Sequence, residues 1–458
     1  MSGKVSPREV SDLIQQNPVR FCEQMLGFTP WSKQREVLEA IRDHKRVAVR
    51  SCHGSGKTAN AARAALWFLA AYPDSRVITT APTYTQVRDL LWAEIHSALY
   101  KAPSGFFPAP STTRLSITDN WFATGVSTNQ PERFQGHHAE NLLLIVDEAS
   151  GVDEDIYSAA EGFMTSDGAR VLLIGNPTRT SGQFYRAFHS ERNQWHTIHI
   201  SAYDTPNLTG EPVIEAAART LVSPTWVAEK EKYWGKDNPM FQVRVLGDFP
   251  TTADDAVLGL AAVEAAQERE LPEDDNPIVV SCDVARYGAD ETVIVIRKGG
   301  HARIHSAYHG KSLMETAGRI MEAARVASEW GTPRIVVDDA GLGGGVTDRL
   351  REQGMTVEAF NSGSTAHDKE LYPNRRSEAW FHFAEMIDDI DLDPDDQLAA
   401  DLVAAKYNVD SSGRRAVEAK DHTKKRLGRS PDRADAILMA YAPQPRTGAS
   451  FGPDIWSD

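Results

Sequence analysis

The feature that most constrains the fold is an alternation of short apolar runs with helical patterns in the first half of the chain. The runs lie at 46–50, 75–82, 141–149 and 170–177. They are apolar without strict alternation, which is typical of strands buried on both faces. Helical patterns at about 57–71 and 84–100 separate the first three runs. This order predicts an α/β domain with a mainly parallel sheet and crossover helices.

A change in composition divides the chain. Between 247 and 277 a short Ala-rich helical pattern lies among acidic segments interrupted by proline, so we expect a linker at 251–276 between domains at 1–250 and 277–458. The second domain begins with an apolar run and an alternating run separated by a Gly-containing turn, which predicts a hairpin. A helical pattern at about 313–330 and another buried strand follow. The second domain is therefore also predicted to be α/β, starting with antiparallel pairing.

Charge limits the kinds of partner. The 458 residues include 64 Asp and Glu against 49 Lys and Arg, a net charge of −15, so any contact with DNA has to come from local basic patches. A hydrophobic fraction of 41% and a charged fraction of 25% argue against a disordered or membrane-spanning chain. Three widely spaced cysteines and an N-terminus without a signal-peptide profile predict a protein of a reducing, cytosolic compartment.

The segment VAVRSCHGSGKTANAARAALWF joins a predicted strand to a predicted helix. Glycines at such a junction let backbone N–H groups wrap phosphate oxygens at the positive end of the helix. Lys57 would reach the β- and γ-phosphates, and Thr58 would bind Mg²⁺. The usual pattern has glycine where this chain has Ser51, and an ordinary strand-to-helix turn is the alternative. The predicted nucleotide contacts of the loop are Ser51, Gly54, Ser55, Gly56, Lys57 and Thr58.

An acidic pair, Asp147 and Glu148, follows the buried run NLLLIV. Ligands bind at the carboxyl ends of strands in open α/β sheets. Asp147 would hold the magnesium ion, through water or Thr58, and Glu148 would polarise the attacking water for in-line hydrolysis. Acidic pairs after strands also serve as helix caps, but together with the phosphate loop this pair predicts a nucleotide hydrolase.

Five further residues are candidates for the nucleotide site. Gln34, just ahead of the first strand, would read the adenine edge with two hydrogen bonds; a surface glutamine is the alternative. Asn176 and Thr178, at the end of a strand, would sense the γ-phosphate. Charge neutralisation in the transition state calls for an arginine, and Arg50 is the first choice and Arg133 the second. The alternative for either arginine is a structural ion pair.

Aspartates mark two strand ends and one helix of the second half. Asp283 lies at the end of IVVSCD and Asp338 ends RIVVD. Asp435 interrupts the apolar stretch of SPDRADAILMAYA, a predicted helix with Ser430 as N-cap and Pro431 as first residue. Because an uncompensated buried carboxylate is costly, Asp435 needs a partner. Carboxylates from two strands and a helix are able to hold two Mg²⁺ or Mn²⁺ ions about 3.5–4 Å apart, which predicts a nuclease site.

Other charged residues near these acids have two interpretations each. Asp290 and Asp339 are alternative ligands, although Asp290 also suits a turn and Asp339 should point opposite to its neighbour along the strand. Asp432, in the first turn of the predicted helix, would interact favourably with the helix dipole. The stretch 414–433 carries a net charge of +5 and favours a DNA-facing surface over a solvated basic loop. The acidic run 388–401 is interpreted as a solvated helix end or loop.

The motifs occur in a recognisable order: GSGKT, APTYTQV, LLLIVDEAS, GNPT, CDVARYGAD, VVDDAGLGGG and SPDRADAILMAYA. From about Trp31 to Ala442 the chain resembles the large terminase subunit of tailed double-stranded DNA bacteriophages. The resemblance implies a RecA-like ATPase domain followed by an RNase H-like nuclease domain. It assigns ATP hydrolysis to Lys57, Thr58, Asp147 and Glu148. It assigns adenine contact to Gln34 and metal binding to Asp283, Asp338 and Asp435.

The same resemblance implies an activity and partners. Such a protein is an ATP-driven motor that translocates viral double-stranded DNA into a procapsid and cleaves concatemeric DNA. Its cofactors would be ATP with Mg²⁺ in the first domain and Mg²⁺ or Mn²⁺ in the second. Its partners would be a small terminase subunit, the portal protein of the procapsid and copies of itself in a ring, with no membrane. It would act in the cytoplasm of the infected bacterial host and be absent from the mature virion.

Two other functions compete on the residues alone. A helicase-like DNA translocase of repair or restriction would share the ATPase, but it needs a second RecA-like domain where this chain offers three acids in a different sheet. A nucleotide-dependent DNA-binding switch without nuclease activity would make the acids of the second half structural.

Overall fold

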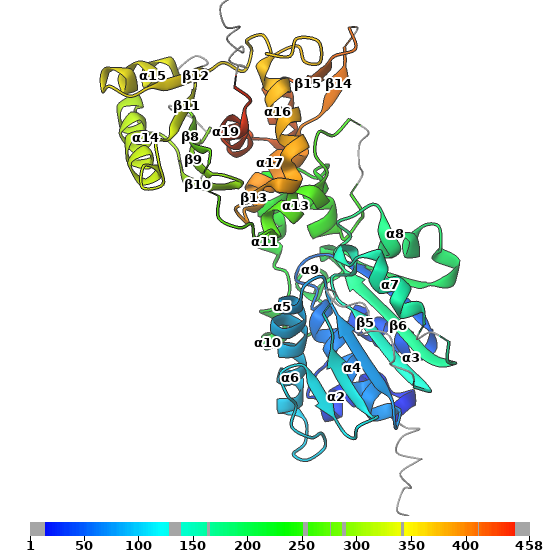
Figure 1. Cartoon of the computed structure of the whole chain (residues 1–458). Coiled ribbons are helices and arrows are strands. Elements are labelled where there is room, and N and C mark those ends of the chain that lie inside the picture. Colours follow the sequence, from blue (N-terminus) through cyan, green and yellow to red (C-terminus); the bar gives the residue numbers. More distant parts are fainter. Residues whose placement is uncertain are drawn as a thin grey trace, which may run out of the picture. The chain divides into compact units, whose positions relative to one another are not determined.

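The computed structural model describes residues 14–127, 139–162, 165–250, 255–274, 276–285, 290–339, 343–410 and 412–444. The chain divides into two compact units (Figure 1). The first comprises residues 1–232 with 239–251, and the second comprises 233–238 with 252–458. Each unit has its own sheet and its own covering helices. The predicted α/β class is confirmed for both.

The sheet of the first unit is mainly parallel, as predicted. Its strand order is β3-β4-β2-β5-β6-β1-β7, and among these described strands only the β3–β4 pair is antiparallel. The strands are β1 (Arg46–Ser51), β2 (Arg76–Thr80), β3 (Arg114–Ser116), β4 (Phe122–Gly125), β5 (Asn141–Val146), β6 (Gly168–Gly175) and β7 (His196–Ile200).

Both faces of this sheet are covered, which explains why its strands are apolar without alternation. Along β5, Leu143 and Ile145 pack into one core cluster and Leu142 and Leu144 into the other, because successive side chains point to opposite faces. The first cluster includes side chains of α2 (Pro18–Met25), α3 (Ser32–Asp43), α4 (Lys57–Ala71), η1 (Val87–Leu91) and α6 (Trp92–Lys101). The second includes side chains of η3 (Ala149–Gly151), α7 (Glu154–Glu161) and α8 (Gly182–Phe188).

Shorter helical segments complete the first unit. The helix predicted at 84–100 is interrupted by η1, a π-helical turn between α5 and α6. The remaining segments are α5 (Tyr84–Gln86), η4 (Arg192–Gln194), η5 (Ala202–Asp204), α9 (Pro206–Thr209), α10 (Glu215–Ala218), α11 (Pro224–Trp234), α12 (Pro239–Phe241) and η6 (Gln242–Leu246). The last two residues of α11 belong to the second unit.

The sheet of the second unit begins with antiparallel strands, as predicted. Its order is β12-β11-β8-β9-β10-β13; β9 pairs antiparallel with β8 and β10, and the other pairs are parallel. A separate hairpin is formed by β14 and β15. The strands are β8 (Ile278–Asp283), β9 (Thr292–Lys298), β10 (His301–Tyr308), β11 (Arg334–Asp338), β12 (Val357–Phe360), β13 (Asp391–Leu392), β14 (Tyr407–Val409) and β15 (Arg415–Val417).

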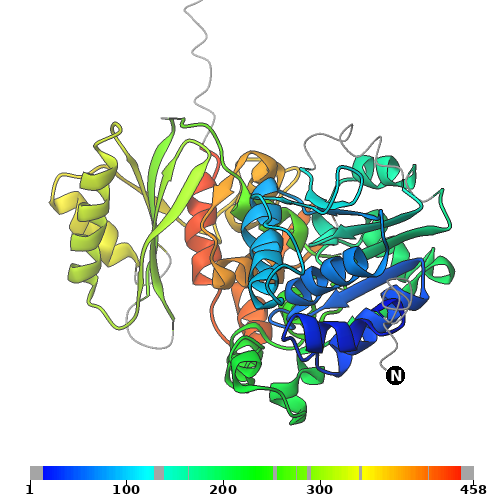
Figure 2. The ribbon, with the colours of Figure 1, turned by 90° about the horizontal axis from the view of Figure 1, so that it is seen from below.

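Helices also cover both faces of this sheet. In Figure 2, α14 and α15 lie on one side of the strands and α19 on the other. Ser281 of β8 donates its hydroxyl to the Ala436 carbonyl of α19 at 2.7 Å. The helices are α13 (Leu260–Glu268), α14 (Leu313–Ala327), α15 (Gly343–Glu352), α16 (Arg375–Met386), η7 (Ile387–Asp389), α17 (Asp396–Ala404), α18 (Lys420–Leu427) and α19 (Asp432–Tyr441).

Two segments bear on the predicted domain boundaries. The predicted linker contains α13, which belongs to the second unit, and Gln267 Nε2 donates to the carbonyls of Asp393 and Asp395 at 2.8 and 2.9 Å. The segment 233–238 is likewise part of the second unit, where Asn238 Nδ2 donates to the Ala400 carbonyl at 3.3 Å. Within the described ranges, no helix is both long and apolar enough to cross a membrane.

Two local predictions are wrong. The helix predicted to start at Pro431 begins at Asp432, so Pro431 rather than Ser430 takes the N-cap position; a shift of one residue at a helix end is small. The acidic run 388–401 is not uniformly solvated, because Asp391 and Asp401 are buried. Asp401 is fully buried and pairs with Arg429 at 2.5 Å, so the acid lies inside because a cation compensates it.

Candidate active sites

The loop between β1 and α4 has the backbone of an anion site. Gly54 and Gly56 adopt left-handed φ angles of +64° and +75°, which favour glycine. A Cβ on Gly56 would lie 2.7 Å from Gln34 Nε2, and one on Gly54 would lie 3.0 Å from the backbone nitrogen of Val222. Gly56 is the N-cap of α4. The unpaired N–H groups of that helix end are therefore available to phosphate oxygens.

Lys57, the first residue of α4, lies among acceptors. Its Nζ is 3.0 Å from Glu148 Oε1 and 3.0 Å from Asn176 Oδ1. Burial lowers the pKa of Lys57, but the carboxylates of Glu148 and Asp147 outweigh burial and hold the pKa above its usual range. The side chain is thus a fixed cation beside the glycine loop.

The two acids that follow β5 have different surroundings. Burial and the neighbouring Glu148 carboxylate raise the pKa of Asp147 to about 6, against the opposing effects of Lys57 and the Thr58 hydroxyl. Glu148 has a φ of +48°, which a side chain other than glycine rarely adopts. Its N–H donates to Asp147 Oδ1 at 3.0 Å. This strained residue places its carboxylate at Lys57, in keeping with the concentration of such strain at functional sites.

Asn176 links the loop to the acids. Its Nδ2 donates to the Ser51 carbonyl at 2.6 Å, and its backbone N–H donates to Glu148 Oε2 at 3.3 Å. Thr178 lies further along the same segment and donates to Ser150 Oγ at 3.2 Å. The structure therefore brings Asn176 together with Lys57 and Glu148, and places Thr178 against the turn after Glu148.

Gln34 and Arg50 have their contacts away from these two acids. Gln34 Nε2 donates to the Gly56 carbonyl at 3.2 Å and its Oε1 accepts from the Trp31 N–H at 3.3 Å, so its amide braces the loop. Arg50 Nη1 is 2.5 Å from Asp248 Oδ1 and donates to the Gly247 carbonyl. Arg133 lies outside the described residues.

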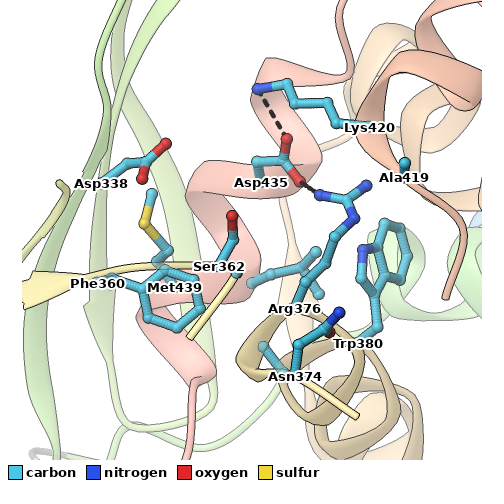
Figure 3. A pocket seen from close by; sticks show the side chains of 13 residues that line it. Asp338, Phe360, Ser362, Asn374, Arg376, Trp380, Ala419, Lys420, Asp435 and Met439 are labelled. Carbon is cyan, nitrogen blue, oxygen red and sulfur yellow. Dashed lines mark hydrogen bonds and ion pairs between the residues drawn. The ribbon is translucent and has the colours of Figure 1, made fainter. Parts of the chain in front are cut away.

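A second cluster of charges lies where β8, α18 and α19 meet. Lys420 Nζ lies 3.0 Å from Asp283 Oδ2, 3.0 Å from Asp432 Oδ1 and 2.9 Å from Asp435 Oδ2. Arg376 Nη1 donates to the other oxygen of Asp435 at 2.8 Å (Figure 3). Two of the three predicted acids, Asp283 and Asp435, therefore share one lysine.

Asp432 belongs to this cluster although its residue type predicted only a helix-dipole role. It lies three residues before Asp435, a spacing that places both side chains on one face of α19. It also accepts the Glu291 N–H at 2.7 Å. The i, i+3 spacing was the signal in the sequence that could have identified it.

Asp338 reaches the same site from β11. It lines a cavity of about 230 Å³ together with Asp435, Lys420 and Arg376, and Figure 3 shows it across the cavity from Arg376. Its neighbour Asp339 does not line this cavity. Of the two adjacent aspartates, the geometry thus favours Asp338.

Asp290, the alternative metal ligand, forms an ion pair with a different lysine. Lys424 Nζ is 2.7 Å from Asp290 Oδ1 and 2.8 Å from its Oδ2. Asp290 is thus the partner of Lys424 rather than of Lys420.

Two acids of this cluster have pKa values shifted in opposite directions. Burial, together with the nearby Asp435, Asp432 and Asp338, raises the pKa of Asp283 well above its usual range in spite of Lys420. For Asp435, burial acts in the same direction, but Lys420 and Arg376 prevail and lower the pKa. The pKa of Lys420 is raised well above its usual range, because the three carboxylates outweigh burial. Lys420 thus supplies the positive charge that these acids need.

Carboxylate oxygens are the ligands that Mg²⁺ and Mn²⁺ prefer, so the donor set fits the predicted metal chemistry. In the structure, Lys420 lies between Asp283, Asp432 and Asp435. Among the described residues, no three or more His, Cys, Asp or Glu side chains are grouped closely enough to hold a metal ion. Metal binding at these acids would therefore require Lys420 to move aside.

The basic stretch 414–433 is largely neutralised within the second unit. Six of its eight Lys and Arg side chains form ion pairs with acids. Its other two cations are Arg415, which lies over the Phe381 ring, and the exposed Lys425. The local charge available to DNA is therefore smaller than the net value of the stretch indicates.

Comparison with known proteins identifies relatives. A comparison with protein-family models finds no match. Among solved structures, the chain is similar to the large terminase of a thermophilic bacteriophage, with 12% identity, a TM-score of 0.41, and coverage of 93% of this chain and 98% of the other. It is also similar to the nuclease domain of the large terminase subunit gp2 of bacterial virus Sf6, with 20% identity, a TM-score of 0.36, and coverage of 41% and 99%.

A curated relative is more informative than these distant structures. A protein of Enterobacteria phage P7, named "Probable terminase, large subunit", is 30% identical over 469 aligned residues, which cover 95% of this chain and 94% of that protein. A match of this extent includes residues of both units. The chain therefore belongs to the family of phage terminase large subunits.

Proposed function

We propose that this chain is an ATP-driven DNA-packaging motor whose first unit hydrolyses ATP and whose second unit cleaves double-stranded DNA. The observation that carries the proposal is the presence of two separate charge clusters, one on each α/β unit. The first surrounds Lys57 at a glycine loop, and the second surrounds Lys420 among aspartates. Family membership is what joins these two chemistries to genome packaging.

ATP hydrolysis follows from the first cluster. The α4 N-terminus and the N–H groups of the loop would bind phosphate oxygens, and Lys57 would exchange its contact with Glu148 for one with the β- and γ-phosphates. Thr58 and Asp147 would hold Mg²⁺, which neutralises phosphate charge when bound. Glu148, freed from Lys57, would orient the attacking water and accept its proton. Asn176, which contacts Lys57 and Glu148, would register loss of the γ-phosphate.

DNA cleavage follows from the second cluster. Asp283, Asp338 and Asp435 would hold Mg²⁺ or Mn²⁺, which supply activated water and stabilise the leaving oxygen when bound. Lys420 and Arg376 would neutralise the phosphodiester as it approaches these acids. The mixed sheet of this unit, which begins with three antiparallel strands, is unlike the second RecA-like domain that a helicase requires.

The packaging role brings partners and a place of action. A small terminase subunit would recognise the viral DNA, the portal protein would hold the motor on the procapsid, and further copies of this chain would complete a ring. The protein would act in the cytoplasm of the infected host and would not remain in the mature virion. Gln34 would contact adenine after its amide leaves Gly56, and Arg50 stays a prediction for the transition-state arginine.

A reciprocal pair of variants tests the two activities in one preparation. Lys57→Ala should abolish ATP turnover and leave Mn²⁺-dependent plasmid cleavage intact, whereas Asp283→Ala should abolish cleavage and leave ATP turnover intact. Thermal unfolding of both variants checks that the substituted units are folded. Retained turnover in Lys57→Ala would refute the phosphate-loop assignment, and equal cleavage by Asp283→Ala and wild type would remove the nuclease.

A further inference from the structure

The cavity beside the second charge cluster has an unusual composition for a nuclease centre. One end is formed by Asp338, Asp435 and Lys420, but the rest of its wall is largely apolar (Figure 3). Trp380 and Phe360, both buried, contribute aromatic rings to that wall. A site that handled only a sugar-phosphate backbone would need positive and polar groups. The apolar wall therefore needs a different explanation.

Hydrogen-bond donors without partners lie in the same wall. Trp380 is fully buried and its Nε1 has no hydrogen-bond partner among the described residues. Arg376, one turn earlier on α16, is held by Asp435 and by the Glu418 carbonyl. Its Nη2 is also buried without a partner in the described part of the chain. Both atoms are almost inaccessible to solvent, so an acceptor group in the cavity would reach them only if the neighbouring side chains shift.

The size of the cavity and the flexibility of its lining limit the kinds of ligand that fit it. The cavity of about 230 Å³ lies below the range of about 300–1,000 Å³ that is typical of sites for drug-sized ligands, so it suits one ring system rather than a whole nucleotide. Met439 also lines the cavity, and its unbranched side chain adapts to different shapes. The site therefore fits a flat aromatic group that carries acceptors on its edge and varies somewhat in outline.

We propose that this cavity receives one nucleobase, extruded from the duplex next to the phosphodiester that the acids cleave. The inference rests on the nuclease function proposed above. All four bases have an aromatic face and edge acceptors, so Trp380, Phe360 and Met439 would hold any of them. Ser362 and Asn374, which also line the cavity, would supply polar contacts to the base edge. Extrusion costs a few kcal/mol of stacking and pairing, and it draws the adjacent phosphate toward Asp435 and Lys420.

Fluorescence of 2-aminopurine tests extrusion without relying on cleavage. The cut site of the full-length wild-type protein is first mapped on a short duplex in Mn²⁺. 2-Aminopurine is then placed at each position within two nucleotides of the cut, and binding is measured in Ca²⁺. We expect the fluorescence to rise by roughly threefold or more at one position, because an unstacked base is no longer quenched. No rise at any position would overturn the proposal.

A variant that fills the cavity tests the site itself. Ala419 is exposed, is the residue before α18 and lines the cavity, so Ala419→Phe would occupy the space with little cost to folding. We expect it to lose the fluorescence rise and to cut the intact duplex about tenfold more slowly. Ala419→Ser, which adds almost no volume, should behave like the wild type. Thermal unfolding of the same preparations checks that both variants are folded.

An abasic substrate separates a filled base pocket from a damaged active centre. With the base removed at the position identified by 2-aminopurine, Ala419→Phe should cut as fast as the wild type to within about twofold. Equal cutting of the intact duplex by Ala419→Phe and wild type, or no rescue by the abasic site, would overturn the base pocket alone. Failure of the wild type to cut any duplex would overturn the nuclease itself, so the two failures are distinguishable.

Discussion

Both candidate sites place one lysine among acids, but the two lysines are surrounded differently. Lys57 contacts one carboxylate and one amide oxygen, at the end of a helix whose N–H groups face the loop. Lys420 contacts three carboxylates from a strand and a helix. In the first arrangement the helix end adds positive potential and suits an anion, whereas in the second the surplus charge is negative and suits a cation. The same ion-pair chemistry therefore prepares one site for phosphate and the other for metal.

The largest expected effect concerns the acid that Lys57 holds. Glu148→Gln keeps the size of the side chain but removes the proton acceptor, so ATP turnover should fall by roughly 10²–10⁴ while ATP binding persists. Steady-state turnover and equilibrium binding of ATP measure the two quantities. Glu154→Gln is the control, because Glu154 pairs with Arg186 and is half exposed. Turnover within about twofold of wild type in Glu148→Gln would contradict the assigned role.

The difference between the two sites also explains how well each could be predicted from sequence. The phosphate loop is a contiguous motif, and its neighbours Asp147 and Glu148 follow a buried strand, so local pattern identifies them. The second cluster is assembled from separate segments, and only tertiary packing brings Lys420 and Arg376 to Asp435. A lysine in a basic stretch and an arginine at the start of a helix carry no local signal of that meeting.

The fold shows the same limit. Runs without alternation predicted the parallel sheet, because burial on both faces leaves a local pattern. The burial of Asp401 was missed, because an acidic run is typical of a solvated segment and only the distant Arg429 makes the interior tolerable. The constraint on Gln34 was also missed, because its partner Gly56 lies 22 positions away.

The next largest effect separates the roles of the two lysines. Lys420→Ala leaves three carboxylates facing one another. The free energy of unfolding in EDTA should therefore fall by about 1–3 kcal/mol. The Lys420 side chain is 34% exposed, which moderates the cost of breaking a buried ion pair. Mn²⁺ should restore more stability to this variant than to the wild type, because a cation replaces the lysine. Thermal unfolding with EDTA or Mn²⁺ measures this.

The exposed Lys425 of the same helix provides the control for that experiment. Lys425→Ala should show neither the loss of stability in EDTA nor the extra gain in Mn²⁺. An equal gain from Mn²⁺ in the wild type and Lys420→Ala would show that the lysine does not compete with metal at these acids.

Another effect depends on pH and on the acid behind the second cluster. Burial, only partly offset by Arg429, raises the pKa of Asp401 from its ordinary 3.8 to about 7. Between these two pH values the folded state therefore keeps a proton that the unfolded chain loses. The resulting contribution of Asp401 to the free energy of unfolding is complete below pH 3.8 and is lost as the pH rises through about 7. The slope is at most about 1.4 kcal/mol per pH unit.

Urea unfolding between pH 4 and 8 measures this contribution. In Asp401→Asn the free energy of unfolding should fall less steeply with rising pH than in the wild type. Because Arg429 has lost its carboxylate, the variant should also differ from the wild type by a constant amount of stability. Asp388→Asn, at an exposed position of the same acidic segment, should keep the wild-type slope. Identical slopes in Asp401→Asn and wild type would mean that Asp401 stays ionised in the folded protein.

The smallest effect concerns Arg50, which lies on the strand leading into the phosphate loop. Its contact with Asp248 is partly exposed, with 22% and 41% of the two side chains accessible, so a double-mutant cycle on unfolding free energy should give a coupling below about 1 kcal/mol. If this pair is its main role, Arg50→Ala and Asp248→Ala should lower ATP turnover to the same small extent. A loss of about 10³ in Arg50→Ala alone would instead show that Arg50 leaves Asp248 to neutralise the transition state. The phosphate site would then resemble the acid cluster, because each would depend on a cation that moves from a carboxylate to its substrate.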